Sequence, residues 1–159
     1  MKIASILSIF IVALFVSCKK DLPEIGGTAA QKMANEWWVT IDQGGAQDPY
    51  GFGHFKIRTY NTAANNDSMW MDDLNQTLGI QIKMGANFNN LTFSVKDAPN
   101  LSGTNTLTIT DGKVLLNAGH SRSGNVVDSI HMQVEFSDDP GNVYEFNGTA
   151  RTRFIEDEY

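Results

Sequence analysis

The chain has a single cysteine and lacks a hydrophobic run long enough to span a membrane. Cys18 is the only cysteine among 159 residues, so no disulfide can form within the chain and the folded core has to be held by side-chain packing. The apolar run from Ile3 to Val16 is shorter than the roughly 20 residues that a helix needs to cross a bilayer. Its place between Lys2 and Ser17 is typical of a signal peptide.

The residues that lead into Cys18 predict how the chain is attached to a membrane. The segment 14–18, LFVSC, resembles the lipobox of bacterial lipoproteins, and the resemblance implies cleavage before Cys18 and acylation of that residue. Several acyl chains anchor a protein stably, whereas one chain binds only marginally. Lys19 follows where an aspartate would favour inner-membrane retention, so we expect an outer-membrane lipoprotein, with the leaflet left open. An ordinary secretory signal is the alternative.

The chain therefore divides into three parts. Residues 1–17 are expected to be a lipoprotein signal peptide. Residues 18–35 hold the lipidated cysteine, a tether and a candidate short helix in TAAQKMAN (28–35). Residues 36–159 are expected to form one domain with one core.

Positive charge is scarce in this chain. It has 12 Lys and Arg against 18 Asp and Glu, a formal net charge of −6. Removal of residues 1–17, which contain one lysine and no acid, makes the mature chain more acidic still. An acidic surface repels nucleic acids and anionic head groups, so we expect no nucleic-acid partner.

Familiar catalytic and metal-binding motifs are missing too. There is no G-x-S-x-G and no H-E-x-x-H, and His54, His120 and His131 lack metal-ligand spacing. Ser121 and Ser123 adjoin His120, but nucleophile and base normally converge from distant parts of a fold. The sequence predicts no catalytic residue, metal or cofactor, and it favours a role other than catalysis without excluding hydrolysis.

Two aspartates and two aromatic residues lie close together in the segment 60–73. Asp72 and Asp73 are expected to cap or solvate the turn that follows Trp70. Tyr60 and Trp70 flank the polar segment 61–68, and they either form an aromatic platform for a ligand or close one end of the core.

Apolar residues alternate with polar ones through most of the remaining chain. A period of two residues with one apolar face predicts half-buried strands, most clearly in IHMQVEF (130–136). We expect about eight strands, at spacings typical of an antiparallel barrel or sandwich. TDGK (110–113) reads as an Asp-Gly hairpin turn, DDPGN (138–142) as a second tight connection, and TARTRF (149–154) as the last strand.

Two features favour a barrel over a sandwich. In many calycin barrels a tryptophan on the first strand is covered by an arginine from the last. Trp37 or Trp38 in EWWV, stacked with Arg151 or Arg153, would meet that description. We therefore predict an all-β domain, a single antiparallel up-and-down barrel of calycin or lipocalin type, with a β-sandwich as the alternative.

The stretch FKIRTYNTAANNDSMWMDD (55–73) carries a resemblance to a known family. Together with EWWV (36–39), IHMQVEF (130–136) and GTARTRF (148–154), it resembles a family of lipoproteins, chiefly from Bacteroidota, described as lipid-binding putative hydrolases. The resemblance covers residues 36–154. It implies a barrel-like fold that binds a lipid or other hydrophobic molecule, and it transfers no catalytic residue to this chain.

These observations predict a membrane-anchored lipoprotein whose barrel binds a hydrophobic small molecule. A structural or accessory lipoprotein that docks a protein or glycan of the cell envelope is the main alternative. Bulky inward side chains would decide between them by filling the interior or leaving it hollow. The candidate ligand-binding residues, in the barrel interior or at its mouth, are Trp37, Trp38, Phe55, Ile57, Tyr60, Trp70, Ile82, Phe93, Met132, Phe136 and Phe146.

Overall fold

The structure of the chain, a computed structural model, describes residues 26–159. The predicted signal peptide and the lipidation of Cys18 lie outside the described residues. No helix within residues 26–159 is long and apolar enough to cross a membrane. The elements are β1 (Asn35–Asp42), β2 (Phe55–Asn61), β3 (Ser68–Asp72), β4 (Gln81–Asn87), β5 (Thr92–Pro99), β6 (Thr106–His120), β7 (Val126–Phe136), β8 (Tyr144–Ala150) and the short 3-10 helix η1 (Ile155–Asp157).

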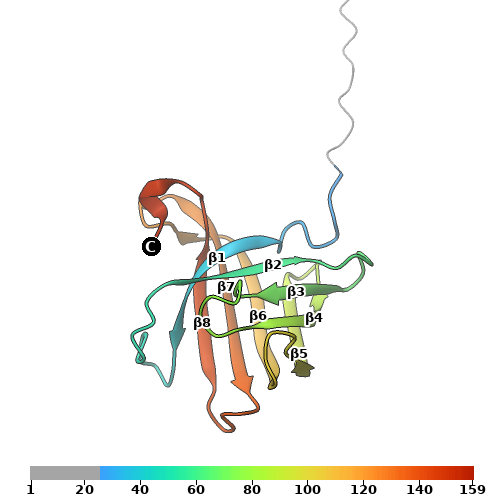
Figure 1. The fold of residues 1–159 in the computed structure, drawn as a ribbon. Coiled ribbons are helices and arrows are strands. Elements are labelled where there is room, and N and C mark those ends of the chain that lie inside the picture. Colours follow the sequence, from blue (N-terminus) through green and yellow to red (C-terminus); the bar gives the residue numbers. More distant parts are fainter. Residues whose placement is uncertain (1–25) are drawn as a thin grey trace, which may run out of the picture.

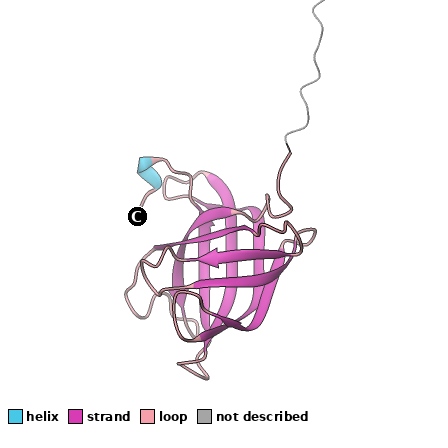
Figure 2. Cartoon of the chain, turned by 45° about the vertical axis from the view of Figure 1, so that its right-hand side comes forward, coloured by secondary structure: helices cyan, strands magenta, loops and turns pink. Residues whose placement is uncertain are grey.

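The eight strands form one closed antiparallel barrel in chain order (Figure 1). Each strand pairs with the next, and β8 returns to β1, where Ile41 lies opposite Phe146. Figure 2 shows the strands wrapped around a common interior, with the loops gathered at its ends. The predicted up-and-down barrel is confirmed, and the sandwich is excluded because closure leaves a single sheet.

Alternation along the strands decides which residues face the interior. In β7 the side chains of Ile130, Met132 and Val134 are buried, while His131 and Gln133 between them point outward. Each strand has one apolar face, and closing the sheet into a barrel buries that face along every strand.

Side chains fill the barrel interior. Trp37, Ile57, Met71, Met132 and Phe146 have 0 % of their surface exposed and belong to one core cluster. A side chain without accessible surface borders no space large enough for a water molecule. The interior beside these residues therefore leaves no room for a ligand in this conformation.

The segment 110–113 is the clearest difference from the sequence prediction. The expected hairpin turn is wrong, because β6 runs without interruption through Asp111 and Gly112. The pairing of β6 with β7 shifts between Thr110 and Lys113, and Asp111 has φ 48°, as in a β-bulge. A Cβ on Gly112 would lie 2.4 Å from the carbonyl oxygen of Phe93, so the close strand contact requires glycine.

The bulge explains how one long strand keeps its apolar side inward. Ile109 and Val114 are both buried, although a regular strand would place residues at these two positions on opposite faces. The extra residue of the bulge restores the alternation. Asp111 adopts a positive φ in this bulge as it would in a turn, while Gly112 is needed for the close contact with Phe93, so the dipeptide alone did not distinguish a bulge from a turn.

The two chain ends also differ from expectation. Residues 28–33 form hydrogen-bonded turns rather than a helix, with the amides of Met33 and Ala34 both donating to the carbonyl of Ala30. Met33 has 0 % of its surface exposed and covers the end of the barrel at which β1 begins. Its carbonyl accepts a hydrogen bond from Thr59. The last strand ends at Ala150, so 151–154 follow the barrel instead of completing it. Residues 26–159 thus contain the closed sheet and its core, the features of a domain that can fold alone.

Candidate functional site

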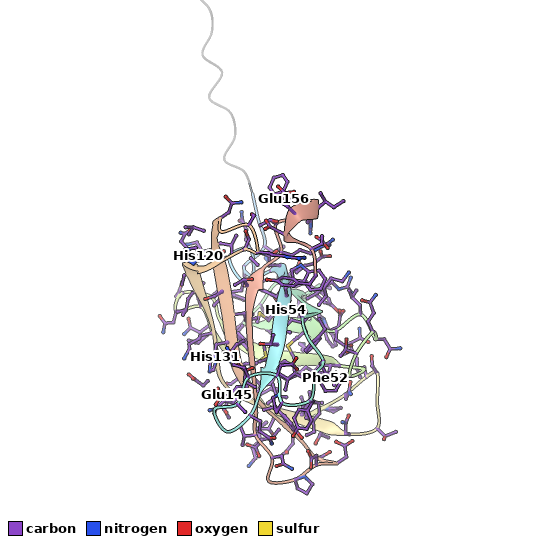
Figure 3. The ribbon with its side chains drawn as sticks, turned by 90° about the vertical axis from the view of Figure 1, so that its left-hand side faces the viewer. Phe52, His54, His120, His131, Glu145 and Glu156 are labelled. Carbon is purple, nitrogen blue, oxygen red and sulfur yellow. The ribbon has the colours of Figure 1, made fainter. Side chains whose placement is uncertain are left out.

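The loops gather at the two ends of the barrel, and the end that the N-terminal segment covers is here called the closed end. The closed end carries the N-terminal segment 26–34 and the loops 62–67, 88–91 and 121–125. The opposite end, here called the mouth, is built by the loops 43–54, 73–80, 100–105 and 137–143. In Figure 3, Phe52 of the mouth lies far from Glu156 of the closed end.

A cavity of about 400 Å³ opens at the mouth. This volume lies within the range of about 300–1,000 Å³ that small-molecule sites occupy. Apolar and aromatic side chains dominate its wall, as is usual for such sites. The cavity is lined by Ile41, Tyr50, Phe52, Leu78, Asn105, Phe136, Asp138, Asp139 and Tyr144.

An aromatic group forms one side of the cavity. Tyr50 packs against Phe52 and Tyr144, with ring centroids 6.3 and 6.0 Å apart, and Tyr144 packs edge-on against Phe136 at 5.8 Å. Tyr50 and Phe52 expose 52 % and 47 % of their surface. Their exposure leaves apolar ring surface that a hydrophobic ligand would cover.

Asp73 fixes the loop that carries Leu78 to the cavity. Its buried carboxylate accepts hydrogen bonds from five backbone amides, those of Asn75, Thr77, Leu78, Gly79 and Ile80, over 2.6–3.2 Å. Amides at successive positions can converge on one carboxylate only if the loop wraps around it. The expected capping role is confirmed for this aspartate.

Asp72 also caps the turn, since it accepts a hydrogen bond from the amide of Leu74 at 3.1 Å, and it stabilises the outer wall as well. Its carboxylate accepts two hydrogen bonds from Arg58, at 2.7 and 2.8 Å, and one from Tyr60 at 3.0 Å. Burial alone would raise the pKa of Asp72, but these hydrogen bonds outweigh it and lower the pKa below its usual value. The Asp72 carboxylate is therefore ionised at neutral pH, and its hydrogen bonds to Arg58 and Tyr60 hold the outer wall together.

The polar part of the cavity is acidic. Asp139 accepts hydrogen bonds from Tyr144 and, at 2.8 Å, from Asn142, and Asp138 accepts one from Asn105 at 3.0 Å. The hydrogen bond from Tyr144 lowers the pKa of Asp139, and the same contact raises the pKa of Tyr144. Asp139 is therefore ionised at neutral pH. No lysine, arginine or histidine is among the described residues that line the cavity.

The residues proposed from the sequence fall into three places. Phe136 lines the mouth cavity. Tyr60 and Trp70 lie opposite each other on β2 and β3 at half-buried outward positions, so they do not close the core. The buried core holds Trp37, Phe55, Ile57, Ile82, Phe93, Met132 and Phe146. A role of these residues in ligand binding stays a prediction.

Trp38 and Arg151 form a contact on the outside of the barrel. The guanidinium of Arg151 lies 6.0 Å from the centre of the Trp38 ring, and Arg151 also pairs with Glu36 and Glu158, each at 2.7 Å. Arg153 is exposed. The pair covers the outer wall, and the tryptophan that enters the barrel is Trp37, whose Nε1 donates to the hydroxyl of Thr59 at 2.8 Å.

The three histidines occupy separate surroundings. His54 stacks on Tyr159 with ring centroids 3.7 Å apart, whereas His131 contacts Asn147 and Asp111 on the outer wall. Figure 3 shows His54, His120 and His131 apart from one another. Within residues 26–159, no group of three His, Cys, Asp or Glu side chains is arranged to hold a metal ion.

Most of the mouth cavity was missed by the sequence analysis. Loop residues of the cavity follow no periodic pattern: Tyr50, Phe52, Leu78, Asn105 and Asp138. Binding residues are often carried by loops, where the strand periodicity gives no signal. One signal was present in the glycine-rich loop 43–54, where Tyr50 and Phe52 are the large apolar side chains.

Comparison with known proteins agrees with this geometry. No curated protein matches the chain. The model of a family described as "Lipid-binding putative hydrolase" matches residues 22–155, which include every strand of the barrel. The resemblance noted in the sequence is confirmed, and the chain belongs to the family of lipid-binding putative hydrolases.

Proposed function

We propose that this protein is an outer-membrane lipoprotein that binds a lipid or other hydrophobic small molecule in the cavity at its mouth. The observation that carries the proposal is the aromatic-lined cavity of about 400 Å³ above an interior filled by side chains. Membership of a family described as lipid-binding supports it. The ligand would lie across the end of the barrel rather than along its axis.

The position of the mouth supports a particular orientation on the membrane. The described chain begins at Gly26 on the closed end, opposite the mouth (Figure 1). Residues 19–25 span at most about 25 Å when fully extended. An acyl group on Cys18 would hold the closed end near the membrane and leave the mouth facing away. The ligand would then be exchanged with the aqueous side or with another protein.

Blocking the mouth tests this function. We would measure binding of the neutral dye Nile red to residues 21–159, which contain the complete barrel. Leu78→Trp would place a larger ring in the cavity and is expected to weaken binding about tenfold or more, a loss of about 1.4 kcal/mol. Leu116→Trp, on an exposed position of β6 outside the cavity, is the matched control and should bind as the unmodified protein does.

Comparison with Leu116→Trp shows whether weaker dye binding by Leu78→Trp comes from the cavity. If both variants bind equally well, the dye does not occupy the mouth and the proposal fails. If the unmodified protein binds no Nile red, the accessory role at the envelope becomes the better explanation.

A further inference from the structure

We infer that the mouth cavity selects amphiphiles whose head group donates hydrogen bonds and carries no negative charge, and discriminates against fatty-acid anions. The inference rests on the proposed function and deepens it by naming the ligand class. It comes from the distribution of charge over the two ends of the barrel and from the hydrogen bonds inside the cavity.

Charge is divided unequally between the ends. The mouth loops 43–54, 73–80, 100–105 and 137–143 contain no lysine or arginine. The closed end and the C-terminal segment that packs beside it hold Lys32, Arg122, Arg151 and Arg153. A negative head group at the mouth therefore finds no lysine or arginine in these loops to pair with, and the imidazole of His54 is stacked on Tyr159.

The acids of the mouth are not equivalent. They are Asp48, Asp73, Asp138 and Asp139. Asp48 accepts hydrogen bonds from the amides of Phe52 and Gly53, at 2.9 and 2.8 Å. Asp73 is likewise occupied by its loop, as described above. These two carboxylates shape the mouth, whereas Asp138 and Asp139 line the cavity.

The two lining carboxylates present acceptor oxygens to a ligand. A carboxylate can accept about four hydrogen bonds. Asp138 is exposed and accepts one, from Asn105, while Asp139 accepts from Tyr144 and Asn142. Asp138 therefore keeps acceptor capacity toward the cavity. An ammonium or hydroxyl group beside the aromatic wall could donate to it.

A carboxylate head group in the same place is disfavoured for two reasons. It would bring like charges within several ångströms of each other, where two unit charges interact strongly in a partly buried site. It would also lose water without gaining a donor from a basic side chain, and an unpaired charge is costly to desolvate. The hydrocarbon tail of either kind of ligand meets the same ring surface of Phe52, Tyr50 and Phe136.

Three ligands with one tail separate the head-group effect from hydrophobic binding. We would titrate residues 21–159 with dodecylammonium, 1-dodecanol and dodecanoate below their micellar concentrations, at pH 7 and low salt. The expected order of affinity is ammonium, then alcohol, then carboxylate, with about tenfold or more between the first and the last. The difference should shrink as salt is raised, because ions screen charge pairs near the surface.

Asp138→Asn tests whether the cavity is responsible for the order. The variant should reduce the ammonium-to-carboxylate ratio by about threefold or more. Asp67→Asn removes the same charge from an exposed position at the closed end and should leave the ratio unchanged.

The outcomes distinguish this inference from the function on which it rests. If dodecanoate binds as tightly as dodecylammonium or more tightly, the inference is overturned while hydrophobic binding at the mouth stands. The same holds if both variants change the ratio equally, because the preference then comes from net charge. If none of the three ligands binds, the proposed function fails together with the inference.

Discussion

Asp73 offers the sharpest test of how the mouth is built. Replacement by asparagine keeps the size of the side chain but turns one oxygen into an NH₂ group. Oδ2 accepts from the amides of Thr77, Leu78 and Gly79, and Oδ1 accepts from those of Asn75 and Ile80. Asp73→Asn therefore deprives one of these two sets of its acceptor.

The size of the effect follows from which donors water can reach. Asn75 is exposed, and its amide can turn to water, whereas Ile80 is buried and Gly79 is half-buried. A buried donor left without a partner costs about 1–3 kcal/mol. With one or two donors stranded, we expect Asp73→Asn to lower the free energy of unfolding by about 3 kcal/mol. This is a large share of the about 5–15 kcal/mol typical of a domain.

Urea unfolding followed by tryptophan fluorescence measures this change. With an m-value of about 1–3 kcal/mol per molar urea, the midpoint should fall by about 1–3 M without a change in m. Asp67→Asn, which removes the same charge from an exposed site, should change the free energy by less than about 0.5 kcal/mol. Equal midpoints for the two variants would refute the role assigned to Asp73.

Two further changes test the bulge and the C-terminal segment. Gly112→Ala places a Cβ 2.4 Å from the carbonyl oxygen of its β5 neighbour and should lower the free energy of unfolding in urea by about 1–3 kcal/mol. Gly26→Ala, whose Cβ would have no atom within 4 Å, is the control and should not lower it. Equal stability of the two variants would contradict the packing at the bulge. Hydrogen bonds from Thr152 and Ser123 lower the pKa of Asp157 to about 2, below the about 3.9 of an unfolded aspartate. The ionised carboxylate thus contributes stability above about pH 4 that is lost as pH falls toward 2. Asp157→Asn should be less stable than the unmodified protein at pH 7 and nearly equal to it near pH 2, and a difference independent of pH would contradict this.

The barrel itself was accessible from the sequence because its physical signal is local and repeated. Each strand alternates apolar and polar residues, as in Ile130–Phe136, and closure satisfies all the strands at once. The Asp-Gly dipeptide at 111–112 misled because an aspartate with positive φ occurs in a bulge as well as in a turn. Deciding between them requires the partner strand, whose Phe93 approaches Gly112 from a distant part of the chain.

The mouth could not be read from the sequence in the same way. Tyr50, Leu78, Asn105 and Tyr144 meet only after β8 has closed onto β1, and no spacing along the chain relates them. Likewise, the sequence offered either Trp37 or Trp38 as the partner of the arginine, and which of the two meets Arg151 depends on where β8 ends.

Locating a bound hydrocarbon chain tests most directly whether this barrel binds at its mouth. We would label the isoleucine and leucine methyl groups of residues 21–159 and record nuclear Overhauser contacts with bound 1-dodecanol. The structure predicts contacts to the methyls of Ile41 and Leu78, which line the cavity. Contacts to Ile57 and Ile82, which are fully buried in the core, would instead show that the interior opens to hold the ligand and would contradict binding at the mouth.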